Sequence, residues 1–313
     1  MTPNGIYVLS EDIKPLPERM INNPDLAGVS LRGRWNEFQP GKESFEWSFD
    51  NEIARAQRAG KKVFLRVDPS RMPDWMPAEG AQSFAFRVAN IHGKDFGQSK
   101  NMPVPWDPVF ITCWSHFIQQ MGQRYAHNST VVMIQMAGAN QGGGELHLPS
   151  DPDAKMQWVE KGYTEEKLVT AYKQIIDAYD AAFPQTQLGL NISEALFQDG
   201  AAETIAQYAF HKLGRRLSIQ HNALHATTKP EAFRIHKIVR SYERKATVGF
   251  QLLSPASSKK NYNGMGNGFG GELHTAFDIG LASGASYFEI YPMDLDDPPS
   301  AADIHQLSLH LAR

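Results

Sequence analysis

The stretch Gly60-Lys61-Lys62-Val63-Phe64-Leu65-Arg66-Val67-Asp68-Pro69 decides the fold class. Its glycine ends a helix, an apolar run follows almost at once, and Pro69 begins a long connection. Connections from helix to strand are equally short at Gly214-Arg215 and Gly284-Ala285, whereas those from strand to helix are long. This asymmetry predicts repeated βα units around a parallel sheet, with the long connections gathered at one end of that sheet.

Eight apolar segments predict eight parallel strands. They are Gly5–Leu9, Gly28–Arg34, Lys62–Asp68, Val131–Ala137, Gln187–Ser193, Leu217–Ala223, Thr247–Leu253 and Ser286–Tyr291. Helices between them have recognisable starts, as at Asp107-Pro108 and at Thr164. We therefore predict one (β/α)8 TIM barrel over residues 1–313, of the α/β class, with long βα loops. An open doubly wound sheet is the alternative, but no strand precedes a Gly-x-Gly-x-x-Gly turn.

Composition excludes several classes of function. Of the 313 residues, 42% are hydrophobic and 21% are charged, which is enough apolar surface for a large core. The 31 basic and 34 acidic residues give a net charge of −3 without long runs of one sign, so we expect no nucleic-acid or membrane partner. One cysteine excludes an internal disulfide. We expect a soluble chain without metal or cofactor; the oligomeric state and the cellular location stay open.

Polar side chains occupy alternate positions near the ends of several predicted strands. They are Arg32, Arg34, Arg66, Asp68, Gln220, Asn222, Gln251, Tyr287, Glu289 and Tyr291. A period of two places them on one face, so they line the barrel interior or its mouth, where they either satisfy one another or form a site. Glu289 alternates with Phe288 and Ile290, so its carboxylate points inward and requires partners.

Two loops are rich in glycine. The segment Gly138–Pro149 follows the fourth strand and presents Glu145 beside His147, where glycines allow close approach of the backbone to a ligand. The segment Gly264-Met265-Gly266-Asn267-Gly268 predicts a mobile lid or substrate loop.

Several of these segments resemble glycoside hydrolases of clan A, of the family 42 and family 5 types. The resemblance covers residues 28–150. It rests on Arg34-Trp35-Asn36-Glu37-Phe38-Gln39-Pro40-Gly41, on Phe45-Glu46-Trp47 and on Pro105-Trp106-Asp107-Pro108. Gly143-Gly144-Glu145-Leu146 is similar to the acid-bearing loop of β-amylases. The resemblance implies a glycosidase that acts on a carbohydrate, and hydrolysis of a glycosidic bond generally uses two carboxyl groups.

By this resemblance Glu145 is the acid/base, and retention of configuration is expected. Clan A enzymes commonly carry an Asn-Glu pair ending strand four and a glutamate ending strand seven. Here the glutamate is delayed to position 145, and strand seven carries Gln251. Glu289 is the best substitute for the second carboxylate because of its inward placement, with Asp68, Glu194 and Glu37 behind it.

The remaining candidates are substrate-binding residues. Arg34, Arg66, Asp68, Asn222 and Tyr291 are expected to position sugar hydroxyls, with His147 and Gln251 beside them. Trp35, Trp75, Trp106 and Trp158 lie in or near the long loops, where an indole can stack on a sugar. Two alternatives stay open, because barrels host many chemistries. One is a catalytically silent carbohydrate-binding barrel, and the other is a lyase or isomerase with a base such as Tyr291.

Overall fold

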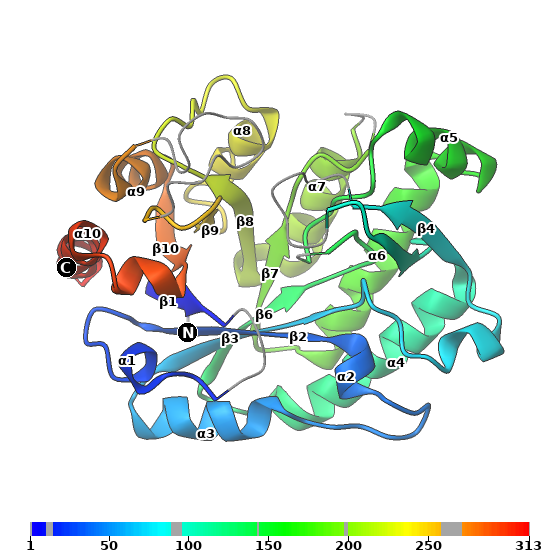
Figure 1. Ribbon diagram of the computed structural model, residues 1–313, viewed down its shortest axis with the longest axis horizontal. Coiled ribbons are helices and arrows are strands. Elements are labelled where there is room, and N and C mark those ends of the chain that lie inside the picture. Colours follow the sequence, from blue (N-terminus) through cyan, green and yellow to red (C-terminus); the bar gives the residue numbers. More distant parts are fainter. Residues whose placement is uncertain are drawn as a thin grey trace.

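The computed structural model describes residues 2–10, 15–88, 96–142, 144–196, 200–257 and 271–312. Eight parallel strands close into a barrel (Figure 1), in which each strand pairs with the next around the ring. The strands are β1 (Gly5–Leu9), β2 (Gly28–Arg34), β3 (Lys62–Asp68), β6 (Val131–Met136), β7 (Gln187–Asn191), β8 (Leu217–Leu224), β9 (Thr247–Leu252) and β10 (Ala285–Ile290). The predicted (β/α)8 barrel is confirmed, and strand ends differ from the prediction by at most two residues. That residues 1–313 form one domain stays a prediction.

Helices surround the barrel (Figure 1). The longer ones are α3 (Phe49–Arg58), α4 (Pro108–Tyr125), α5 (Pro152–Glu160), α6 (Glu165–Ala182), α7 (Ala201–Leu213), α8 (Arg234–Arg240), α9 (Leu273–Ala282) and α10 (Pro298–Leu311). Short turns complete the set: α1 (Glu18–Ile21), α2 (Trp35–Phe38), η1 (Met76–Glu79), η2 (Gly214–Arg216) and η3 (Pro292–Leu295). The predicted helix starts are confirmed, since Asp107 accepts from Phe110 N at 2.9 Å and Thr164 accepts from Lys167 N at 3.1 Å.

The long connection after β3 contains a hairpin that the sequence analysis did not predict. Its strands are β4 (Ser83–Arg87) and β5 (Ser99–Pro103), which pair antiparallel. The Phe84 ring of β4 stacks on Trp158 of α5 with centroids 3.6 Å apart, so the hairpin lies beside α5 (Figure 1). This packing fixes the hairpin to the barrel. The glycine-rich segment at 264–268 lies outside the described residues.

The barrel interior is closed at one end by an apolar plug, which we define as Tyr7, Phe64, Val132, Met133 and Tyr287. Glycines on the strands make room for its rings. A Cβ at Gly249 would lie 2.0 Å from Cζ of Tyr287, so a side chain there would force the ring to shift. A larger core fills the space between strands and helices. Among the described residues, none of the helices combines the length and the hydropathy needed to cross a bilayer.

Candidate active site

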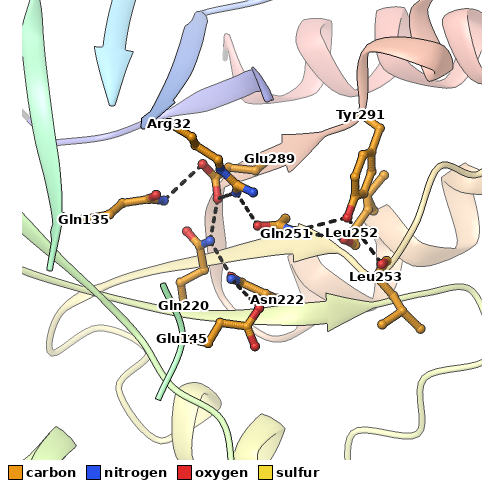
Figure 2. A network of polar contacts seen from close by, with 10 residues as sticks. All are labelled: Arg32, Gln135, Glu145, Gln220, Asn222, Gln251, Leu252, Leu253, Glu289 and Tyr291. Carbon is orange, nitrogen blue, oxygen red and sulfur yellow. Dashed lines mark hydrogen bonds and ion pairs between the residues drawn. The ribbon is translucent and has the colours of Figure 1, made fainter. Parts of the chain in front are cut away.

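The barrel interior beyond the plug is polar, and Glu289 lies at its centre. Glu289 is on β10, where it pairs in register with Tyr7 of β1 and Gln251 of β9, and it is fully buried. Gln135 Nε2 donates to its Oε1 at 3.0 Å, and Gln220 Nε2 donates to its Oε2 at 2.6 Å. Arg32 Nη2 forms an ion pair with Oε2 at 3.5 Å (Figure 2). A buried carboxylate requires such compensation, and both of its oxygens receive it.

Glu145 lies on the loop after β6, and its side chain joins the polar interior around Glu289. Asn222 Nδ2 donates to Glu145 Oε1 at 2.9 Å, and Gln220 Nε2 donates to Asn222 Oδ1 at 2.7 Å. Because Gln220 Nε2 also bonds Glu289, two neutral amides of β8 connect the two carboxyl groups (Figure 2). The structure therefore brings the two predicted catalytic residues into one hydrogen-bonded network at the carboxyl ends of the strands, which is where barrel enzymes build their sites.

The side chain of Asn140 holds the loop that carries Glu145. It is fully buried, and its Oδ1 accepts from the backbone N–H groups of Gly142 at 2.7 Å and Gly144 at 3.3 Å. Its Nδ2 donates to Asp68 Oδ1 at 3.2 Å and to Gly138 O at 2.7 Å. All four hydrogen-bonding positions of the amide are therefore used within the protein, which makes Asn140 a positioning residue for the loop.

Arg66 lies beneath this loop. Gly144 has a φ of +73°, a conformation that favours glycine. A Cβ at this position would lie 2.5 Å from Arg66 Cδ, so the backbone of Gly144 packs directly against the arginine side chain. Arg66 is 3% exposed, and its Nε and Nη1 have no hydrogen-bond partner in the described part of the chain. Burial, followed by the nearby Arg32 charge, lowers the pKa of Arg66 to about 10, so it stays cationic at neutral pH. It can donate to a polar group brought near Glu145.

Gln251 and Tyr291 complete one side of the network. Gln251 Oε1 accepts from Arg32 Nη2, and Gln251 Nε2 donates to the Tyr291 hydroxyl at 3.4 Å. Tyr291 in turn donates to Leu253 O at 3.4 Å (Figure 2). Strand β9 therefore contributes an amide, and the carboxylate stands one strand further along, on β10.

His147 lies close to Glu145. Burial lowers the pKa of His147, although the Glu145 charge acts in the opposite direction. Its Nδ1 is 3.5 Å from Ser193 Oγ. The ring is therefore a neutral neighbour of Glu145 near pH 7, able to donate or to accept one hydrogen bond.

The predicted role of Trp35 and Trp158 in stacking on sugars is wrong, because both are fully buried. Trp35 packs against other aromatic rings and donates to Gln39 Oε1 at 2.8 Å, and Trp158 packs under Phe84. Trp75 and Trp106 are half-buried and line two outer cavities whose walls include neither Glu145 nor Glu289. The structure does not bring these two tryptophans to the site.

The other predicted residues lie at the barrel mouth or beyond it. Arg34 and Asp68 are paired in register at the ends of β2 and β3, and both line a polar cleft. Of the reserve carboxylates, Asp68 bonds Asn140, whereas Glu37 pairs with Arg34 at 3.2 Å and Glu194 pairs with Arg234 at 3.0 Å. Glu37 and Glu194 therefore pair with arginines that do not belong to the amide network.

Sequence reasoning missed Gln135 and Asn140 as site residues. Gln135 is the one polar residue in the apolar strand Val131–Met136, and that isolation was a usable signal. Arg32 and Gln220 were recognised only as inward polar positions. Asn140 carried no signal of its own, because an asparagine in a glycine-rich loop is ordinary.

Solved structures with a similar barrel include β-galactosidases. That of Bacillus circulans sp. alkalophilus superposes with a TM-score of 0.66 at 12% identity, over 99% of this chain and 56% of that one. That of the psychrophilic Marinomonas ef1 gives 0.61 at 11% identity, over 98% and 59%. That of the Antarctic haloarchaeon Halorubrum lacusprofundi gives 0.59 at 12% identity, over 100% and 58%. At such identities the likeness shows the fold, and this chain spans less than two thirds of those enzymes.

Sequence comparison identifies the family. A search of curated proteins gives no match. The family model described as beta-galactosidase, that of glycoside hydrolase family 42, matches residues 7–183, which is more than half of the 313 residues. The predicted resemblance to family 42 is thereby confirmed, and the chain belongs to glycoside hydrolase family 42.

Proposed function

We propose that the chain is a glycoside hydrolase that cleaves an oligo- or polysaccharide, with Glu145 as the acid and Glu289 as the second carboxylate. One observation carries the proposal: the amides of Asn222 and Gln220 link the two carboxyl groups in one network. Family membership gives the reaction class, and the network supplies the pair of acids that the reaction requires.

The proposed reaction has two steps. Glu145 gives its proton to the glycosidic oxygen as the bond to the anomeric carbon breaks, and a Glu289 oxygen attacks that carbon to form a glycosyl ester. Water, deprotonated by Glu145, then releases the sugar and regenerates Glu289. This sequence retains configuration. Arg66, Asn222 and His147 lie near Glu145 and are assigned to the sugar hydroxyls, with Gln251 and Tyr291 on the opposite side.

A screen of aryl glycosides and oligosaccharides tests the proposal, beginning with β-galactosides because the similar structures are named β-galactosidases. The anomer that forms first, followed by proton NMR, gives the stereochemistry. We expect hydrolysis by the wild type and none by Glu145→Gln or Glu289→Gln. Glu203→Gln, an exposed change on α7, is the matched control and should retain full activity. Unchanged hydrolysis by Glu145→Gln would contradict the acid assignment.

A second candidate is a carbohydrate-binding barrel without catalysis. Two observations favour it: β9 carries Gln251 in place of a carboxylate, and Glu289 is fully buried among three donors. Calorimetric titration separates the candidates, since a binder gives saturable heat with sugar and no product over long incubation. A hydrolase gives product that disappears in the Glu145→Gln variant.

A further inference from the structure

We propose that a cleft beside the barrel mouth binds the leaving-group side of an oligosaccharide, so that the substrate is a chain of several sugar units. This rests on the proposed function. The cleft has a volume of about 680 Å³. Its walls come from the strand ends, the connection after β3, the hairpin and the loop after β6, including Arg34, Asp68, Arg71, Lys100, Asn101 and Gln141.

The cleft lies beside the loop that carries Glu145 and shares residues with it. Gln141 and Gly142 form part of its wall, and Asn140 ties Gly142 and Gly144 to Asp68, another wall residue. Glu289 lies deeper, inside the barrel. In the proposed binding mode, a sugar whose anomeric carbon faces Glu289 has its leaving oxygen toward Glu145. The sugar units attached to that oxygen then extend past the loop into the cleft.

The chemistry of the walls suits a ligand rich in hydroxyl groups. Arg71 and Lys100 supply cationic donors, Asp74 supplies an anionic acceptor, and Asn101 and Gln141 supply amides that donate and accept. Clefts of about 300–1,000 Å³ hold drug-sized ligands. The cleft falls within that range, and most of its wall residues are polar or charged.

The hairpin that forms one wall is fixed in place, which a binding surface requires. β4 and β5 pair over five register positions, from Ser83 with Pro103 to Arg87 with Ser99. Phe84 and Met102 are fully buried on the side toward α5, with Phe84 stacked on Trp158. The wall is therefore held by packing before any ligand arrives, so ordering it costs little on binding.

The test measures binding against chain length. Galacto-, xylo-, manno- and cello-oligosaccharides, each from the monosaccharide to the pentasaccharide, are titrated into the Glu145→Gln protein by calorimetry. In the series that the protein recognises, affinity should rise about ten-fold or more from disaccharide to tetrasaccharide, as expected for a few added hydrogen bonds. Arg71→Ala and Asn101→Ala, each added to that protein, should remove about three- to ten-fold of this gain while leaving disaccharide affinity unchanged.

Arg87→Ala is the matched control, because Arg87 is an exposed residue of the same hairpin that does not line the cleft. The proposal is overturned if affinity is independent of length in all four series, or if the cleft variants behave like Arg87→Ala. Failure of the hydrolase proposal is distinguishable: the wild type would then form no product, while the length-dependent binding and its loss in the cleft variants would persist.

Discussion

The same strands line both ends of the barrel interior, but the side chains are apolar at one end and polar at the other. Near the amino ends of the strands, the plug is aromatic and apolar, with Tyr7 stacked on Phe64 at 3.7 Å and Phe64 edge-on to Tyr287 at 5.3 Å. Toward the carboxyl ends, Arg32, Gln135, Gln220 and Glu289 form a hydrogen-bonded layer. Tyr287 and Glu289 are two residues apart on β10, so both side chains point into the barrel, one in the apolar plug and the next in the polar layer.

The plug and the polar layer are stabilised by different interactions. Burial of apolar surface stabilises the plug, whereas the polar layer is compensated only by its own hydrogen bonds. Several buried polar atoms in or beside that layer have no partner within the described residues, among them Gln135 Oε1, Arg66 Nε and both polar side-chain atoms of Asn191. Such groups can hydrogen-bond a polar ligand, and removal of a partner within the layer is costly because it leaves a further buried polar group unpaired.

The largest expected effect is on turnover, at the loop end of the polar layer. Glu145→Gln removes the proton donor but keeps an acceptor for Asn222, so we expect kcat to fall by about 10²–10⁴-fold with an unchanged melting temperature. Steady-state kinetics and thermal unfolding monitored by circular dichroism measure the two quantities. A large loss of melting temperature would show that Glu145 supports the fold as well.

The next effect is on stability, at the centre of the polar layer. Glu289→Ala leaves Arg32 without its buried partner carboxylate and leaves Gln135 and Gln220 without an acceptor, so we expect a loss of about 3–5 kcal/mol in the free energy of unfolding. Urea unfolding measures it. Glu289→Gln, which keeps one acceptor oxygen, should lose less, and equal losses for both variants would argue against the network.

A third carboxyl group, that of Asp294, lies in η3 just beyond the end of β10. Asp294 is fully buried and accepts from Ser257 N at 3.2 Å and Tyr291 N at 3.3 Å, and burial raises its pKa to about 6. Because the folded protein holds this proton more tightly than the unfolded chain, the contribution is present at low pH and is lost as pH rises from about 4 to about 6.

Comparison with Asp294→Asn isolates this contribution, because asparagine keeps an acceptor and does not titrate. The wild-type free energy of unfolding, relative to that of the variant, should fall by about 2 kcal/mol across this pH range. Urea unfolding at a series of pH values measures it. A difference between the two proteins that does not change with pH would contradict the prediction.

The smallest effect is expected in the plug. Gly249→Ala places a Cβ 2.0 Å from the Tyr287 ring, and the overpacking should cost about 1–3 kcal/mol of unfolding free energy. Gly189→Ala is the matched change, because its Cβ would lie 3.0 Å from the flexible Met133 side chain, which can move. Urea unfolding should rank Gly249→Ala as the less stable protein, and the reverse order would show that the plug is loosely packed.

The barrel could be predicted from sequence because strand and helix periods repeat along the whole chain. Glu289 could be predicted as inward because apolar residues flank it on both sides. The hairpin could not, since each of its strands has only five residues and Ser99–Pro103 combines lysine, asparagine and proline with a single methionine. The tryptophans were misjudged because position in a long connection does not reveal whether a ring turns outward or, like Trp35, into the core.

The amides of β8 have a further consequence for the two carboxyl groups on either side of them. Gln220 and Asn222 are neutral, and each turns an N–H group to a carboxylate. They lie between the two carboxyl groups in the hydrogen-bonded network, so each carboxyl group accepts from an amide. Converting Asn222 to aspartate would place a third acid in the row and remove that separation.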